Sequence, residues 1–227
     1  AAVVVPLNAY VGLELGSAFD RSVFHVGREG DSHRLRGRLG LLFQTLASAG
    51  SRSPNGRIQV RAEYASKSNS FVVDGAEDTS RNQQALWSGF FEGNWPLAAR
   101  HELSARGTWH ILDSDEDEIV ESELFYFGGA RSLRGYREDQ FRGDQVLYGG
   151  VEYRIGASRG AQAYAFIDAG GLRRKQSGGG FQREEHVGYG LGLRGQVPTG
   201  VFDIAFGFGE DRSISGAKLH VSLLQRF

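Results

Sequence analysis

Histidine, serine and acidic side chains are the groups from which this chain could build a hydrolytic active site. The six histidines are scattered along the chain, without the H-E-x-x-H spacing that places two imidazoles on one metal ion. His110 and His220 fall in segments of alternating polarity, where a hydrolase could place them in a polar cavity. However, no Ser, His and Asp arrangement can be established from these spacings. We therefore predict no catalytic residue and no enzyme.

Two further motifs resemble binding sites for small ligands. Residues 113–118 read D-S-D-E-D-E, but this acidic run lacks the Gly and the distal Glu of a calcium loop. We expect it to be a solvated loop and predict no metal site. Residues 190–195 read G-L-G-L-R-G and match the dinucleotide fingerprint G-x-G-x-x-G. That fingerprint must open a helix, whereas here it lies in an alternating segment, so we expect no cofactor.

The composition excludes several classes of protein. Lys and Arg total 26 against 27 Asp and Glu, and the net charge of -1 gives no basic surface for nucleic acid. The absence of Cys excludes disulfides and thiolate metal sites. Hydrophobic residues make up 40% of the chain, yet no apolar run approaches the roughly 18 residues of a membrane-spanning helix. Strands of a membrane barrel remain compatible with this pattern, because their apolar residues alternate with polar ones.

Period-two alternation is the dominant pattern of the sequence. In residues 57–64 (R-I-Q-V-R-A-E-Y), one face carries two Arg, a Gln and a Glu, and the other carries Ile58, Val60, Ala62 and Tyr64. A charge that faces lipid at mid-membrane costs about 2–4 kcal/mol. A register slip by one residue would expose three charges, so the charged face is predicted to line a wet lumen. A soluble β-sandwich is the alternative explanation of alternation alone.

Aromatic residues and connection lengths favour a membrane barrel over a soluble β-sandwich. Trp87, Phe91 and Trp95 share one face, as in an aromatic girdle, and Phe227 ends the last alternating segment. Short and long connections alternate along the chain, as they do between the periplasmic and outer ends of a barrel. The sequence thus predicts an all-β antiparallel transmembrane β-barrel, with both termini in the periplasm. About ten strands are expected, near residues 8–19, 34–47, 57–67, 84–96, 100–112, 145–156, 161–170, 187–197, 200–209 and 217–227.

Four ordered motifs give this pattern a family resemblance. Residues 125–136 read F-Y-F-G-G-A-R-S-L-R-G-Y, which resembles the signature on the sixth extracellular loop of the BamA/TamA/FhaC superfamily of bacterial-surface-antigen-type barrels. Residues 148–154 (Y-G-G-V-E-Y-R), 165–170 (A-F-I-D-A-G) and 188–200 (G-Y-G-L-G-L-R-G-Q-V-P-T-G) are similar to the strands that follow that loop in the family. The resemblance covers residues 84–227 well.

The resemblance implies a loop that folds back into the lumen. Its motif comprises Ser132, Leu133, Arg134, Gly135 and Tyr136. Parity places Glu152 on the lumen face of its strand, and Asp168 shares a face with Tyr164 and Phe166. In such a loop Arg134 can meet Glu152 and Asp168, because a planar guanidinium suits carboxylates. Two loop glycines, Gly128 and Gly129, would let the backbone turn tightly.

The same resemblance implies insertion or translocation of polypeptides at the bacterial outer membrane. The expected partners are outer-membrane lipids, client polypeptides or barrel proteins, and further outer-membrane or periplasmic subunits. The alternatives are a non-catalytic structural or partner-binding barrel in a complex, and a plugged pore. We expect residues 1–227 to form one barrel domain. Since the family barrel has sixteen strands and carries POTRA domains, neither of which is found here, this domain would be a reduced barrel or the C-terminal part of a longer one.

Overall fold

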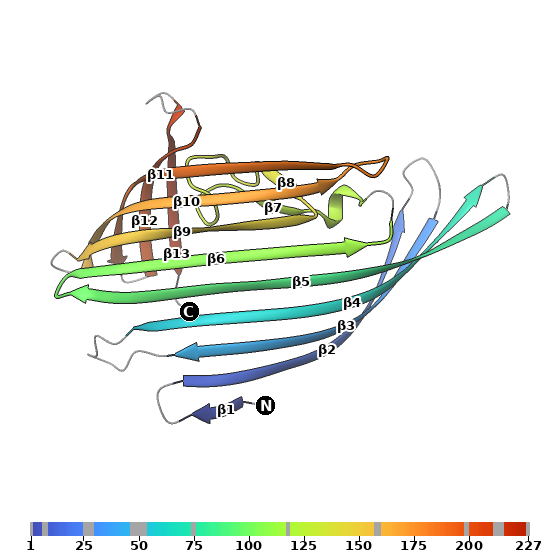
Figure 1. Ribbon diagram of the computed structural model, residues 1–227, viewed down its shortest axis with the longest axis horizontal. Helices are drawn as coiled ribbons and strands as arrows, with labels where there is room; N and C mark the ends of the chain where they lie inside the picture. The colour runs from blue at the N-terminus through green and yellow to red at the C-terminus, as the bar shows by residue number, and fades with distance from the viewer. Residues whose placement is uncertain are drawn as a thin grey trace.

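Eleven antiparallel strands form one sheet in the computed structural model, which describes residues 2–5, 9–24, 30–45, 54–73, 76–116, 119–156, 160–197, 200–210 and 216–225 (Figure 1). Their order in the sheet is that of the sequence, apart from β7 and β8, which form a separate ribbon. The sheet comprises β1 (Ala2–Val5), β2 (Ala9–Phe24), β3 (Gly30–Thr45), β4 (Asn55–Val73), β5 (Ala76–Ala98), β6 (His101–Ser114), β9 (Gln145–Gly156), β10 (Gln162–Lys175), β11 (Phe181–Val197), β12 (Gly200–Phe208) and β13 (Lys218–Gln225).

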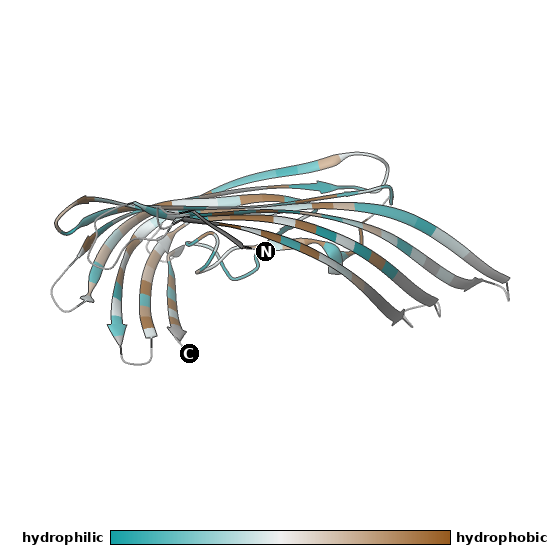
Figure 2. Ribbon diagram, turned by 90° about the horizontal axis from the view of Figure 1, so that it is seen from below, coloured by the Kyte–Doolittle hydropathy of each residue, from teal (hydrophilic) through white to brown (hydrophobic). Residues whose placement is uncertain are grey.

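The predicted all-β antiparallel class is confirmed, since the ten expected strands correspond to β2–β6 and β9–β13. The expected closed barrel is not formed. Within the described ranges, β1 and β13 are the edge strands of the sheet, and each pairs with one neighbour only. The sheet is a strongly curved open arc (Figure 2). A closed barrel pairs both sides of every strand, so this arc is an incomplete barrel wall.

Large apolar side chains gather on the outer face of the arc. Ile58 and Val60 are 43% and 39% exposed, whereas their polar neighbours Gln59 and Arg61 point to the concave face. The same holds on every long strand, for example at Leu15, Leu39, Trp87, Leu147, Ile167, Leu191, Phe206 and Leu219. Apolar side chains turned toward hydrocarbon and ionic ones around a cavity are the pattern of a membrane barrel. No helix of the described residues is long and apolar enough to cross a membrane.

Several strands extend beyond their predicted ends. The predicted strand ends at residues 67 and 84 are wrong, because β4 continues to Val73 and pairs there with β5 from Ala76. The predicted ends at residues 170 and 187 are also wrong, because β10 reaches Lys175 and β11 begins at Phe181. Residues 66–70 read S-K-S-N-S, which is polar on both faces. A hairpin that projects into water needs no apolar face, so alternation does not reveal it.

The connection between β6 and β9 is the segment that fills the concave side of the arc. It contains the 3-10 helix η1 (Glu121–Glu123) and the ribbon of β7 (Phe125–Phe127) and β8 (Phe141–Gly143). Apolar residues of this loop pack on the inner face of the wall in a buried cluster, which comprises Phe127, Leu133, Tyr136, Phe141, Val146 and Leu172. The loop therefore lies against the sheet instead of extending into solvent.

Neighbouring positions on β4 test the two faces. Val60→Arg places a charge on the outer face, whereas Gln59→Arg places the same side chain on the concave face near Glu14. We expect Val60→Arg to lower the free energy of unfolding in lipid vesicles by about 2–4 kcal/mol, and Gln59→Arg to change it by less than about 1 kcal/mol. Denaturant titration of the vesicle-folded chain measures both. Equal losses would contradict the assignment of faces.

Candidate functional site in the lumenal loop

Glycines allow the tip of the loop to approach the wall. Gly128, Gly129 and Gly135 have φ angles of 126°, 91° and 96°, in the left-handed region that other residues rarely adopt. A Cβ atom on Gly135 would lie 2.5 Å from the carbonyl oxygen of Phe208 in β12. The Ser132 hydroxyl accepts the N–H of Gly128 at 2.7 Å and donates to its carbonyl oxygen at 2.8 Å, which closes the turn. This turn presents the next residues to the wall.

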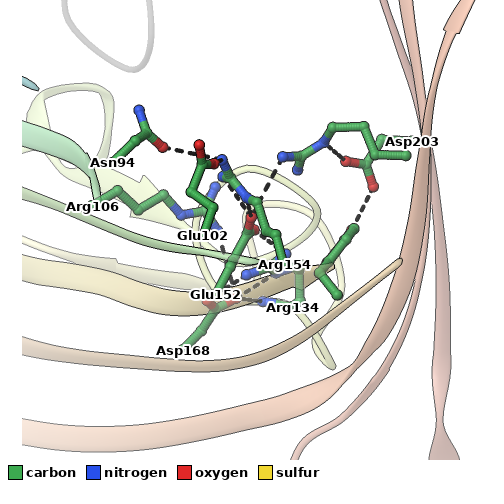
Figure 3. A network of polar contacts seen from close by, with 10 residues as sticks. Asn94, Glu102, Arg106, Arg134, Glu152, Arg154, Asp168 and Asp203 are labelled. Carbon is green, nitrogen blue, oxygen red and sulfur yellow. Dashed lines mark hydrogen bonds and ion pairs between the residues drawn. The ribbon is translucent and has the colours of Figure 1, made fainter. Parts of the chain in front are cut away.

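Arg134 is the centre of the contact between loop and wall (Figure 3). Its Nε and Nη2 donate to the two carboxylate oxygens of Asp168 on β10 at 2.7 and 2.8 Å, and its Nη1 donates to Glu152 on β9 at 2.6 Å. The backbone N–H of Arg134 also donates to Asp168, at 3.1 Å. The exposed fractions of the three side chains are 3%, 0% and 6%. The structure thus brings together the three residues that the sequence analysis grouped.

The buried guanidinium is held as a cation by its neighbours. Burial by itself would lower the pKa of Arg134, but the hydrogen bonds and charges of Asp168 and Glu152 raise it above its ordinary value. The Phe166 ring lies 3.6 Å from the guanidinium carbon and supplies a cation–π contact. Removal of one partner from such a buried set leaves an uncompensated charge, which typically costs about 3–5 kcal/mol.

Further ion pairs extend this site along the inner wall. Glu152 also pairs with Arg154 at 2.7 Å and with Arg194 at 3.5 Å. Arg154 in turn contacts Glu102 on β6 at 2.9 Å, and its Nη1 donates to Asn94 on β5 at 3.0 Å. The resulting chain of charges crosses β5, β6, β9 and β11 in one layer of the lumen (Figure 3). Such a layer fixes the relative positions of several strands around one loop residue.

The opposite end of this layer reaches β12. The Arg194 Nε donates to Asp203 at 2.5 Å, and the Tyr164 hydroxyl donates to the same carboxylate at 2.5 Å. Arg106 on β6 adds a further positive charge beside Asp168, since its Nη2 lies 3.5 Å from a carboxylate oxygen of that residue. That contact is too loose for a hydrogen bond, and the nitrogen is buried. Arg106 therefore acts on Asp168 through charge.

The remaining motif residues fasten the loop to β11, β12 and β13. The Gly135 N–H donates to Nε2 of His220 on β13 at 3.1 Å. The Tyr136 hydroxyl donates to the carbonyl oxygen of Val187 at 3.0 Å and accepts the N–H of Glu210 at 3.1 Å. Leu133 is fully buried. Leu133, Arg134, Gly135 and Tyr136 thus contact the wall, whereas Ser132 closes the turn within the loop. Phe227, the predicted end of the last strand, lies outside the described residues.

Glycines on the inner face of β11 explain the G-x-G-x-x-G match. A Cβ atom on Gly188 would lie 1.9 Å from the Arg134 carbonyl oxygen, and one on Gly190 would lie 2.8 Å from the Phe166 ring. On Gly192 it would lie 2.2 Å from the Tyr164 ring. These glycines leave room for the loop and for the aromatic side chains beneath it. Gly190 and Gly192 of the motif therefore serve close packing in a strand, whereas a Cβ atom on Gly195 would have no neighbour within 4 Å.

Sequence reasoning missed part of the site. Asp203, Arg194 and His220 were not grouped with Arg134, although each lies on the inner face that period-two parity assigns. Parity identifies such inward residues but does not say at which height on the wall they meet. Among the described residues, no group of three or more His, Asp or Glu could hold a metal ion. The arrangement is an electrostatic anchor for a loop, and bond-making chemistry is not needed to explain it.

Comparisons with known proteins place this chain in a family. A family model described as the Omp85 superfamily domain matches residues 48–226. Among solved structures, CdiB from Acinetobacter baumannii is similar, with 19% sequence identity and a TM-score of 0.43. The match covers 89% of this chain but 44% of CdiB, so this chain spans less than half the length of that protein. No curated protein matches the chain.

Truncation of Arg134 tests the anchor. We expect Arg134→Ala to leave the sheet folded and to release the loop, because Asp168 and Glu152 lose their central partner. Limited proteolysis of the chain in vesicles should then cut residues 128–136 readily. Arg131→Ala, an exposed arginine of the same loop, is the control and should leave cleavage unchanged. Equal protease resistance of Arg134→Ala and the parent chain would contradict the anchor.

The glycines of β11 provide an independent test. Gly188→Ala forces a methyl group against the Arg134 backbone, and we expect a loss of about 1–3 kcal/mol in unfolding free energy. Gly195→Ala on the same strand is the matched control, because a Cβ atom there has no neighbour within 4 Å. Denaturant titration measures both variants. A Gly188→Ala chain as stable as Gly195→Ala would show that the loop does not pack as described.

Proposed function

Because this chain belongs to the Omp85 superfamily of outer-membrane polypeptide transporters and insertases, we propose that it assists the insertion or translocation of polypeptides at the outer membrane of a bacterium. The match of the superfamily domain over residues 48–226 is the observation that carries the proposal. The anchored lumenal loop supports it, because this loop carries the motif that resembles the sixth extracellular loop of the superfamily. The proposed partners are outer-membrane lipids and client polypeptides.

The proposed mechanism uses backbone pairing. A strand at the edge of a sheet presents unpaired N–H and C=O groups, and an extended client segment can add to it as a further strand. β13 pairs with β12 on one side only within the described residues. Such an edge would receive a client strand while the ionic inner wall keeps the lumen hydrated. We further propose that residues 1–227 act as one barrel domain within a larger barrel wall, since the described sheet is an open arc.

Reconstitution tests this function. The full chain is placed in liposomes, and an unfolded outer-membrane barrel is added as the client. We expect the client to fold faster than with empty liposomes, because the membrane-embedded edge lowers the barrier to pairing its first strand. Arg134→Ala should reduce the acceleration, and Arg131→Ala should retain it.

Two other results would overturn the proposal in favour of the alternatives. A large, steady ionic conductance without acceleration of client folding would indicate a pore. Absence of both, together with a stoichiometric partner that purifies with the chain, would indicate a structural or partner-binding barrel.

A further inference from the structure

Glu116, from the acidic run, belongs to a second contact between the lumenal loop and the wall. We name the described residues 113–116 and 119–124 the acidic limb. It leaves β6 and crosses the concave side toward β4 and β5. Ile119 and Leu124 are each 5% exposed and pack with Leu112 in a buried cluster. Within the predicted solvated run at 113–118, Asp113 and Asp115 are exposed as expected, whereas the Glu116 side chain is only 9% exposed.

Lys67 of β4 holds two carboxylates of the acidic limb. Its Nζ lies 2.9 Å from an oxygen of Glu116 and 3.1 Å from an oxygen of Glu123. The side chains of Lys67 and Glu116 are each 9% exposed, and that of Glu123 is 12% exposed. A lysine this deeply buried is stable only when it is paired, so the limb and the lysine require each other.

Polar groups of β3 and β5 complete this contact. The Gln84 Nε2 donates to Glu123 at 2.8 Å and to Glu116 at 3.3 Å, and the Asn82 Nδ2 donates to Glu116 at 3.0 Å. Arg34 of β3 also pairs with Glu123. The four wall side chains thus satisfy both carboxylates from three adjacent strands.

The electrostatics of Glu123 agree with this arrangement. Burial would raise the pKa of the Glu123 carboxyl, but the charges of Lys67 and Arg34 hold it below its ordinary value. Without Lys67, two carboxylates that now share one ammonium group would face each other with less compensation. Their repulsion would push the limb from the wall.

The two contacts join different halves of the sheet. Arg134, Gly135 and Tyr136 fasten one end of the loop to β9–β13, whereas the carboxylates of the acidic limb are fastened to β3–β5. Lys175 at the end of β10 holds only the backbone of the limb, through the Glu116 carbonyl oxygen at 2.5 Å. The second contact is less buried. The side chains of Lys67, Glu116 and Glu123 are 9%, 9% and 12% exposed, and those of Arg134, Asp168 and Glu152 are 3%, 0% and 6% exposed. A cavity of about 170 Å³, lined in part by Arg34, Gln84 and Glu123, lies beside the limb. More exposed ion pairs are screened more strongly by salt.

We propose that Lys67 is a positioning residue that makes the lumenal loop a strut between the two halves of the sheet, and that the acidic limb is the end that releases first. Release would free the concave face of β3–β5 while Arg134 keeps the other end in place. In the proposed function, this movement would widen the lumen for a client. That consequence rests on the proposed function, whereas the anchoring itself does not.

Single cysteines can report each end, because the chain has no Cys of its own. Leu124→Cys reports the acidic limb and Leu133→Cys reports the Arg134 end, and both positions are buried. The full chain is reconstituted in liposomes, and the rate of maleimide labelling is measured. We expect Lys67→Gln to raise the rate at position 124 roughly tenfold, which corresponds to about 1.4 kcal/mol. The rate at position 133 should not change.

Controls separate positioning from loss of structure. Lys67→Arg keeps the charge and should restore protection at position 124. Lys218→Gln, which removes a lysine from β13, should have no effect at either position. Unchanged labelling at position 124 in Lys67→Gln, or equal increases at both positions, would overturn the proposal. No client is needed, so these outcomes are independent of the proposed function.

Discussion

Burial of a guanidinium inside the barrel wall is the interaction on which the loop and its surroundings depend. A charge taken out of water must be paired and hydrogen-bonded, or it costs several kcal/mol. Arg134 meets this demand with Asp168 from β10 and Glu152 from β9, and both oxygens of Asp168 are used. These strands are adjacent and antiparallel, so their register fixes the height at which the loop attaches. The loop position therefore follows from the pairing of the sheet.

The same constraint shapes residues far from the ion pair. Arg134 can reach the wall only because Gly188 leaves space for its carbonyl group, and the Phe166 ring beneath it fits only because position 190 is glycine. A strand rich in glycine is weak by itself. The glycines of β11 leave space on its inner face, and the loop fills this space with its backbone and with the Tyr136 side chain. Wall and loop thus form one packed unit.

The outer face of the same strands is adapted to lipid instead of water. Leu191, between Gly190 and Gly192, is 67% exposed on the outer face, where a bilayer would cover it. The outer side of a strand holds apolar residues, since lipid offers no hydrogen bonds, and charges are placed on the inner side, where other polar groups can pair with them. This division lets one strand carry an ionic layer for the loop and an apolar surface for the membrane. It also confines the functional residues to alternate positions.

Alternation in the sequence was enough to predict ten of the strands, the two faces of each and the inward position of Glu152 and Asp168, because successive side chains in a regular strand point to opposite faces. The loop motif was enough to name Arg134. Tertiary structure alone decided that residues 68–73 and 76–83 continue as strands, since in water neither face needs to be apolar. It also decided that Glu116 and Glu123 meet Lys67, because contacts between residues 49 and 56 positions apart depend on how the loop folds across the wall. The local sequence indicates whether a side chain faces lipid or water. Which residue it pairs with depends on the path of the whole chain in the fold.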